Sequence, residues 1–149
     1  MSLFTRQIEA AVEIDAPADR VWQVLTDFEA YPEWNPFIRR ARGRIQTGER
    51  LQMRLDIPQG RKMKLKVKIV SVAPGRSFQW LGVVGVRGLF DGLHRFQIED
   101  AGADSVRLLQ HERFSGMLVP LLGGYVAGGA RRGFEAMNRA LKQRVEETV

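Results

Sequence analysis

The sequence contains no cysteine and only two histidines among its 149 residues. Without cysteine the chain can form no disulfide bond, no thiolate nucleophile, no cysteine-bound zinc site and no iron–sulfur cluster. Two histidines are too few for a metal site unless carboxylates complete the ligand set. We therefore expect neither a metal ion nor a cofactor.

Long apolar runs are also missing, because no stretch approaches the roughly 20 residues that a membrane-spanning helix requires. The first residues, MSLFTRQIEA, lack the basic region, apolar region and cleavage site of a secretory signal. We expect a protein that is not embedded in a membrane and that resides in the cytoplasm.

Motifs for nucleotide and ester chemistry are absent as well. The glycine pairs Gly123-Gly124 and Gly128-Gly129 have neither the spacing of a dinucleotide-binding turn nor the Gly-Lys-Ser/Thr of a phosphate loop. No Gly-x-Ser-x-Gly sequence occurs either. Nucleotide hydrolysis and serine-hydrolase chemistry are therefore not expected.

The overall composition, with 44% hydrophobic and 27% charged residues, is that of an ordinary globular protein. A chain of this length can bury roughly 68–70% of its unfolded surface in one core. We predict a single domain over residues 1–149.

The N-terminal third predicts a strand, a helix and an aromatic segment. Residues 7–15 alternate between apolar and polar side chains, which is typical of a half-buried strand, and a short helix is expected over residues 18–26. Residues 28–37 contain two prolines and should form one helical turn between loops. Because a residue before proline disfavours the helical region, we expect Tyr31 and Asn35 to be extended or in turns.

The remainder predicts a sheet covered by one helix. Further strands are indicated at residues 38–45, 50–57, 62–69, 78–84, 90–98 and 105–114, separated by short turn sequences. Short turns without helical crossovers indicate an antiparallel meander with one face on the core. Apolar side chains at helical spacing over residues 119–147 predict a helix about 40 Å long that can cover this face.

This order of elements resembles the helix-grip fold of the START/Bet v 1-like (SRPBCC) superfamily, in its bacterial polyketide cyclase/dehydrase and lipid-transport branch. The resemblance covers essentially the whole chain and rests on VEIDAPADRVWQVLTDFEAYPEWNPF at residues 12–37, supported by FQW, GLHRF, ERFSG and GFEAMN further on. It implies an α+β fold with a seven-stranded antiparallel sheet, two short N-terminal helices and one long C-terminal helix. It also implies an apolar cavity that holds a lipid, polyketide, sterol or quinone.

Alternation also places three polar side chains on the core face of the predicted sheet. His94 shares its face with Phe90, and Gln110 and Glu112 share the core face of the last strand. A buried carboxylate is costly unless it is paired. Two interpretations stay open for His94 and Glu112: a structural pair within the core, or a ligand contact that acts as acid and base.

The same reasoning yields apolar candidates for a ligand-binding surface, each with core packing as the alternative role. Trp34 and Phe37, on the aromatic segment, are expected at the rim of the cavity. Further candidates for its lining are Met53, Leu55, Trp80, Phe90, Phe96, Phe134 and Met137.

The formal net charge of +6 raises the question of an anionic partner. Lysines at positions 62, 64, 66 and 68 share the solvent face of one predicted strand, and arginines cluster over residues 39–44. A solvated face is the favoured interpretation, because evenly spaced lysines discourage edge pairing. These strands could also attract an anionic membrane, whereas nucleic acid is not expected because exposed aromatics are not interleaved.

Three functions follow from these patterns. Binding or transport of a hydrophobic small molecule is favoured. The first alternative is a polyketide cyclase/dehydrase-type enzyme that uses Glu112 and His94 as acid and base on an enolisable ligand. The second is an accessory protein that docks on a membrane or partner through the basic strands.

Overall fold

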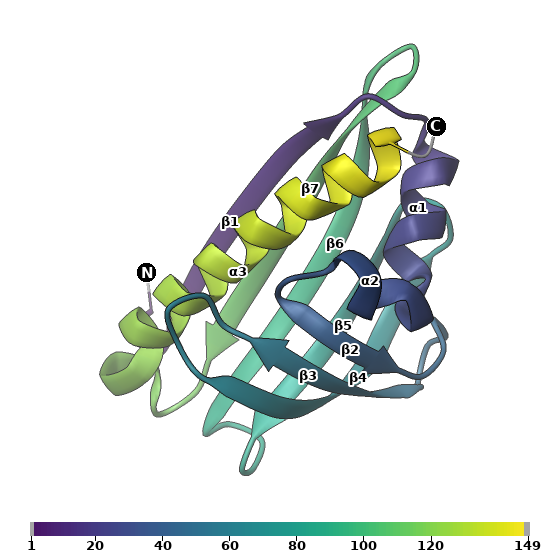
Figure 1. Cartoon of the computed structure of the whole chain (residues 1–149). Coiled ribbons are helices and arrows are strands. Elements are labelled where there is room, and N and C mark those ends of the chain that lie inside the picture. Colours follow the sequence, from purple (N-terminus) through teal and green to yellow (C-terminus); the bar gives the residue numbers. More distant parts are fainter. Residues whose placement is uncertain (1, 148–149) are drawn as a thin grey trace.

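The protein is described by a computed structural model over residues 2–147, which consists of a seven-stranded antiparallel sheet and a set of helices on its concave side (Figure 1). The predicted α+β helix-grip architecture is confirmed. In chain order the elements are β1 (Thr5–Ile14), α1 (Ala18–Thr26), a 3-10 turn (Phe28–Ala30), α2 (Tyr31–Trp34), β2 (Ile38–Arg42), β3 (Arg50–Asp56), β4 (Lys62–Ala73), β5 (Ser77–Val84), β6 (Phe90–Gly102), β7 (Ser105–Ser115) and α3 (Val119–Glu147).

The sheet is a meander with one addition at its end. Its strand order is β1-β7-β6-β5-β4-β3-β2, so consecutive strands pair from β2 to β7 and β1 joins at the far edge. Where β1 pairs with β7, Ile8 lies opposite Glu112 and Ala10 lies opposite Gln110. The first and last strands in sequence are therefore neighbours, and α3 runs along them (Figure 1).

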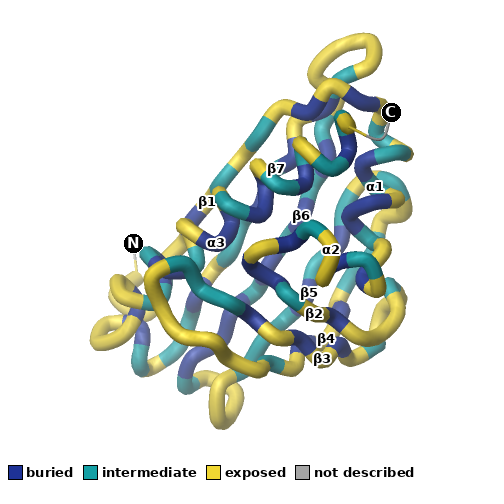
Figure 2. Tube along the Cα trace, viewed as in Figure 1, coloured by how far each residue is buried: buried dark blue, intermediate teal, exposed yellow. Residues whose placement is uncertain are grey.

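The helix α3 covers the concave face with its C-terminal half. Figure 2 shows a buried stripe on the side of this helix that faces the sheet. The stripe contains Phe134, Met137, Leu141 and Val145, all of which are almost fully buried. No helix within residues 2–147 combines the length and apolarity needed to cross a bilayer.

The segment around α2 differs from the prediction at one residue. Asn35 is extended as expected, with φ −87° and ψ 111°, but Tyr31 is helical, with φ −53° and ψ −39°. Proline at the second position of a helix removes no intrahelical hydrogen bond, so the preference of the residue before it can be overridden by packing. The ring of Tyr31 is fully buried between Phe28 and Trp34.

Two side-chain hydrogen bonds shape this segment. The Tyr31 hydroxyl donates to the carbonyl of Leu25, one of the carbonyls that the C-terminal end of α1 leaves without a helical partner. Burial raises the pKa of Tyr31, so the hydroxyl keeps its proton. The Asn35 side-chain oxygen accepts from the backbone of Phe37 at 3.0 Å and Ile38 at 2.9 Å, which starts β2.

We expect Tyr31→Phe to lower the free energy of unfolding by about 1–3 kcal/mol, because it leaves the buried Leu25 carbonyl without a donor. Urea denaturation followed by circular dichroism measures the change. Tyr125→Phe is the matched control, since Tyr125 is 76% exposed and its change should stay within about 0.5 kcal/mol. Equal effects of the two substitutions would contradict the assigned hydrogen bond.

Candidate functional site

A cavity of about 300 Å³ lies between the concave face of the sheet and the N-terminal half of α3. Its walls come from Phe37, the inward faces of β2 to β7, the β3–β4 turn and the first turns of α3. Most wall residues are apolar, and the charged or titratable exceptions deep in the fold are His94 and Glu112. The cavity opens to solvent beside Leu122 and Tyr125, which line it and are themselves exposed.

Eight of the twelve sequence-derived candidates line this cavity. They are Phe37, Met53, Leu55, Trp80, Phe90, His94, Glu112 and Phe134.

The other four candidates, Trp34, Phe96, Gln110 and Met137, do not line the cavity. Trp34 packs edge-on against Tyr31, with ring centroids 5.2 Å apart. Phe96 is enclosed by the rings of Phe78 and His94, at 4.8 and 4.4 Å. Met137 is fully buried in the filled half of the core. Trp34 therefore lies in the aromatic cluster of α2 and not on the cavity wall.

Sequence reasoning missed the part of the lining that comes from α3. Leu118, Leu122, Tyr125 and Val126 line the cavity at and before the first turns of this helix. The sequence does indicate this contribution. Residues 117–130 contain no charged side chain, so this part of the helix lacks the polar, solvent-facing side of an ordinary amphipathic helix. A helix that is apolar around its circumference needs more than one apolar neighbour.

His94 is held between two polar side chains of β7. Its Nε2 lies 3.0 Å from Gln110 Oε1, and its Nδ1 lies 3.4 Å from Glu112 Oε1. The register explains this geometry, since His94 is the cross-strand partner of Glu112 and Phe96 that of Gln110. The imidazole is almost fully buried, while the Glu112 side chain retains 16% exposure.

The hydrogen-bond network fixes where the imidazole proton lies. The Gln110 amide nitrogen faces α3, donating to Asn138 Oδ1 at 2.8 Å and to the Phe134 carbonyl at 3.5 Å. Because that carbonyl can only accept, the Gln110 oxygen must face His94 and accept from Nε2. The proton of a neutral His94 therefore resides on Nε2, and Nδ1 faces Glu112.

Two glycines make room beside this pair. Gly82 on β5 and Gly92 on β6 are direct cross-strand partners, and both line the cavity. A Cβ atom added to Gly92 would collide with Oε2 of Glu112. The carboxylate thus occupies the space that a side chain at position 92 would take. Because Gly82 and Gly92 have no side chains, the cavity extends down to the backbone of β5 and β6.

The other histidine takes no part in this site. His111 lies on the opposite face of β7, where its Nε2 is 2.9 Å from Gln7 Oε1. Desolvation lowers the pKa of His111, so it is neutral near pH 7. Within residues 2–147 no group of three or more Asp, Glu or His side chains is arranged to hold a metal ion.

The site can therefore present one carboxylate–imidazole pair to a molecule in an apolar cavity. Among the residues described, Glu112 has no polar partner other than His94. Its second oxygen, beside Gly92, is available to hydrogen-bond a ligand or to exchange a proton with it.

Comparison with known families gives a match over almost the whole chain. The family model described as "Polyketide cyclase / dehydrase and lipid transport" matches residues 5–146. No curated protein matches the chain.

Solved structures share the fold. A START superfamily protein from Mycobacterium smegmatis is 27% identical with a TM-score of 0.75, covering 96% of this chain and 99% of that one. The ZhuI aromatase/cyclase from Streptomyces sp. R1128 is 18% identical with a TM-score of 0.76, over 96% and 94% of the two chains. Norcoclaurine synthase from Thalictrum flavum is 17% identical with a TM-score of 0.74, over 97% and 96%. At such identities the last two establish the fold alone.

We expect Gly92→Ala to displace the Glu112 carboxylate from His94 and to lower the free energy of unfolding by about 1–3 kcal/mol through overpacking. Gly82→Ala is the matched control, because its added Cβ would lie 3.5 Å from Val67 Cγ1, an ordinary contact. Crystal structures and urea denaturation of both variants measure the two effects. An unmoved carboxylate in Gly92→Ala would refute the assigned packing.

Proposed function

This chain belongs to the polyketide cyclase/dehydrase and lipid-transport family, and on that premise we propose that it binds a hydrophobic small molecule in the cavity between its sheet and α3. The resemblance inferred from the sequence is confirmed. The observation that carries the proposal is the cavity of about 300 Å³, whose wall is apolar except for a few polar groups.

The size and chemistry of the cavity support a ligand of a particular kind. Its volume is at the lower end of the roughly 300–1,000 Å³ of small-molecule sites. Aromatic rings of Phe37, Trp80, Phe90 and Phe134 form much of the wall and favour a flat apolar body. A hydroxyl or carbonyl group on that body would meet Glu112, which lacks a second partner.

We favour binding or transport over catalysis because the deep part of the wall contains a single titratable pair, His94 and Glu112, while Arg61 and Arg132 lie near the opening. One carboxylate–imidazole pair is sufficient to orient a ligand through one hydrogen bond. The remaining wall offers apolar contact and excludes water, as a carrier for a poorly soluble molecule requires.

Filling the cavity from the helix tests the proposal. Ala130 lines the cavity on α3, and Ala130→Phe should weaken binding of the fluorescent aromatic probe 1-anilinonaphthalene-8-sulfonate by about tenfold or more, because the added ring takes the ligand's space. Native mass spectrometry of the wild-type protein should in addition detect a co-purified hydrophobic molecule. Ala136→Phe makes the same change on α3 outside the cavity and should leave probe binding intact. Equal probe binding by all three proteins would contradict the proposal.

The His94–Glu112 pair favours a second candidate, an enzyme of the cyclase/dehydrase type. In that reaction Glu112 would take a proton from the carbon beside a ligand carbonyl, and the resulting enolate would attack a second carbonyl or expel a hydroxyl group. Glu112 would return its proton to the new alkoxide in the first case and to the departing hydroxyl, which leaves as water, in the second. His94, held by Gln110, would exchange a proton with Glu112 through Nδ1.

Isotope exchange distinguishes the two candidates. With the ligand identified by mass spectrometry, an enzyme should incorporate deuterium at the carbon beside the carbonyl in D₂O, and Glu112→Gln should slow this by roughly 10²–10⁴-fold with ligand affinity nearly unchanged. Nuclear magnetic resonance of the ligand measures the incorporation. A carrier should bind the ligand without any exchange above the rate in buffer.

A further inference from the structure

Exposed apolar side chains gather at one end of the molecule. Among large hydrophobic residues exposed on residues 2–147, Val70 on β4 is the one that lies outside this group. We define the mouth rim as six of the others: Val84, Val86, Met117, Leu121, Leu122 and Tyr125. Leu3, Phe4 and Met63 are exposed beside it.

The rim comes from adjoining segments and includes residues that line the cavity. Val84, Leu122 and Tyr125 line the cavity. Backbone hydrogen bonds of 3.0 Å join Met117 to Gly88 in the β5–β6 turn and Gly116 to Phe4 near the N-terminus. Three segments that are distant in sequence thus meet around one opening.

The solvent-facing side at the start of α3 is apolar, although it is exposed to water. Met117, Leu121 and Tyr125 follow one another at intervals of four residues and are 74%, 79% and 76% exposed. The opposite side of the same turns is also apolar, with Val119 buried in the core. A helix in water normally presents polar residues on its outer face, and clustered exposed apolar side chains mark an interaction site.

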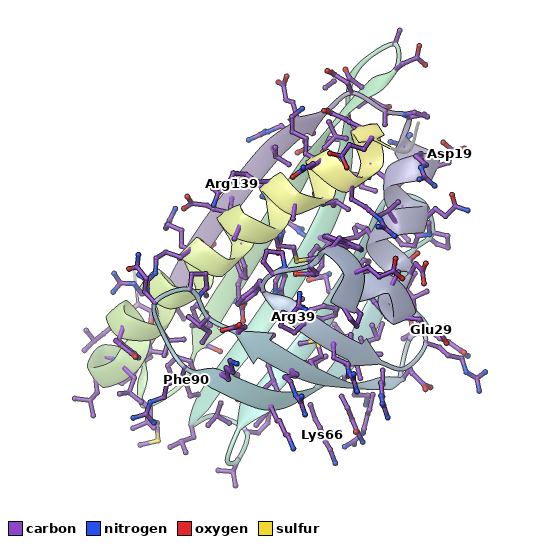
Figure 3. The ribbon with its side chains drawn as sticks, viewed as in Figure 1. Asp19, Glu29, Arg39, Lys66, Phe90 and Arg139 are labelled. Atoms are coloured by element: carbon purple, nitrogen blue, oxygen red, sulfur yellow. The ribbon has the colours of Figure 1, made fainter. Side chains whose placement is uncertain are left out.

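The charges around the rim have one sign. The segments that form this end of the molecule, residues 2–8, 57–63, 83–90 and 116–134, contain no Asp or Glu. They carry the exposed arginines Arg6, Arg61, Arg87 and Arg132, and Arg61 and Arg132 line the cavity near its opening. Asp91, which follows the third of these segments, is buried and paired with Arg87 at 3.4 Å. Labelled acidic residues such as Asp19 and Glu29 lie at the opposite end (Figure 3).

We propose that the mouth rim is a docking surface for the anionic surface of a lipid bilayer, with the cavity opening toward the lipid. An apolar centre fringed by cations matches the bilayer interface, where acyl chains lie just below negatively charged head groups. Tyrosine is enriched at that boundary, because its ring is apolar and its hydroxyl can remain hydrated. Each arginine near such a surface contributes electrostatic attraction.

The charge distribution argues against a second copy of the chain as the occupant. A two-fold symmetric dimer through the rim would place the same patch on both sides of the interface. The arginine fringe of one copy would then face the arginine fringe of the other without compensating carboxylates, which is unfavourable. An anionic lipid surface provides the missing negative charge.

The rim also differs from the basic strands that the sequence suggested as a docking surface. On the outer face of the sheet, Arg40 lies opposite Arg54 and Arg54 opposite Lys64, so like charges are neighbours across three strands. This face points away from the cavity and offers little exposed apolar area. It can add long-range attraction, but it cannot insert into a bilayer or open the cavity toward one.

The role of the docked state rests on the proposed function, because a hydrophobic ligand could then move between bilayer and cavity without crossing water. Docking itself does not depend on any ligand. The two proposals therefore fail separately: probe binding in solution tests the cavity, and vesicle association tests the rim.

The absence of cysteine makes a site-specific test possible. Leu121→Cys and Val70→Cys are each labelled with an environment-sensitive fluorophore such as NBD and mixed with vesicles of phosphatidylglycerol and phosphatidylcholine. Insertion of the rim should shift the emission of the label at position 121 to shorter wavelength and leave the label at position 70 unchanged. No shift at position 121, or equal shifts at both positions, would overturn the proposal.

A second experiment measures association without a label. In vesicle co-sedimentation, Met117→Ser/Leu121→Ser should bind at least about tenfold more weakly than the wild type, because two apolar side chains no longer leave water. Val70→Ser should bind like the wild type, and probe binding in solution should be the same for all three proteins. Binding should fall with rising salt and be weak to phosphatidylcholine alone. Unaltered vesicle binding by the double variant would refute the role of the rim, as would a wild-type dimer that the double variant abolishes.

Discussion

The fit between the long helix α3 and the curved sheet determines where the core is filled and where a cavity remains. The 29 residues of α3 extend about 43 Å over a sheet whose strands bend around it. In the C-terminal half, large side chains such as Phe134 and Leu141 fill the space between the two layers. In the N-terminal half, Val126, Gly129 and Ala130 line the cavity, and the space between helix and sheet stays open. One helix therefore acts as core at one end and as cavity wall at the other.

The polar pair in the cavity depends on the same arrangement. Gln110 reaches α3 because the filled half of the core brings Phe134 and Asn138 within hydrogen-bond distance. That contact orients the amide, and the amide orients His94 toward Glu112. The orientation of the polar pair is thus set by packing against the middle of α3.

Much of the fold could be predicted from the sequence, because its signals are local. Alternation determined which face of each strand is buried, and the N-terminal motif indicated the family. Tyr31 departed from its local preference because burial and one hydrogen bond outweigh the effect of the following proline.

The site could be predicted only in part, because strand alternation reports the face of a residue and not its depth. Phe96 and Gln110 are on the predicted face, yet they lie in the filled half of the core. The contribution of Leu122 and Tyr125 was missed because an apolar helix face is normally assigned to the core. Their exposure depends on where the helix extends past the neighbouring strands, which is a property of the assembled fold.

The facing glycines of β5 and β6 have a consequence for how such a protein can diversify. Gly82 and Gly92 shape the cavity by the side chains they lack, but only position 82 has room for an added side chain. A Cβ atom at position 82 would make only ordinary contacts with Val67 and Leu65, whereas the space at position 92 is occupied by the Glu112 carboxylate. A small side chain at position 82 can therefore alter which molecules the cavity accommodates, while glycine at position 92 preserves the contact between Glu112 and His94. The residue that sets which ligand fits and the residue that keeps Glu112 in place are therefore different, although Gly82 and Gly92 are direct partners across β5 and β6.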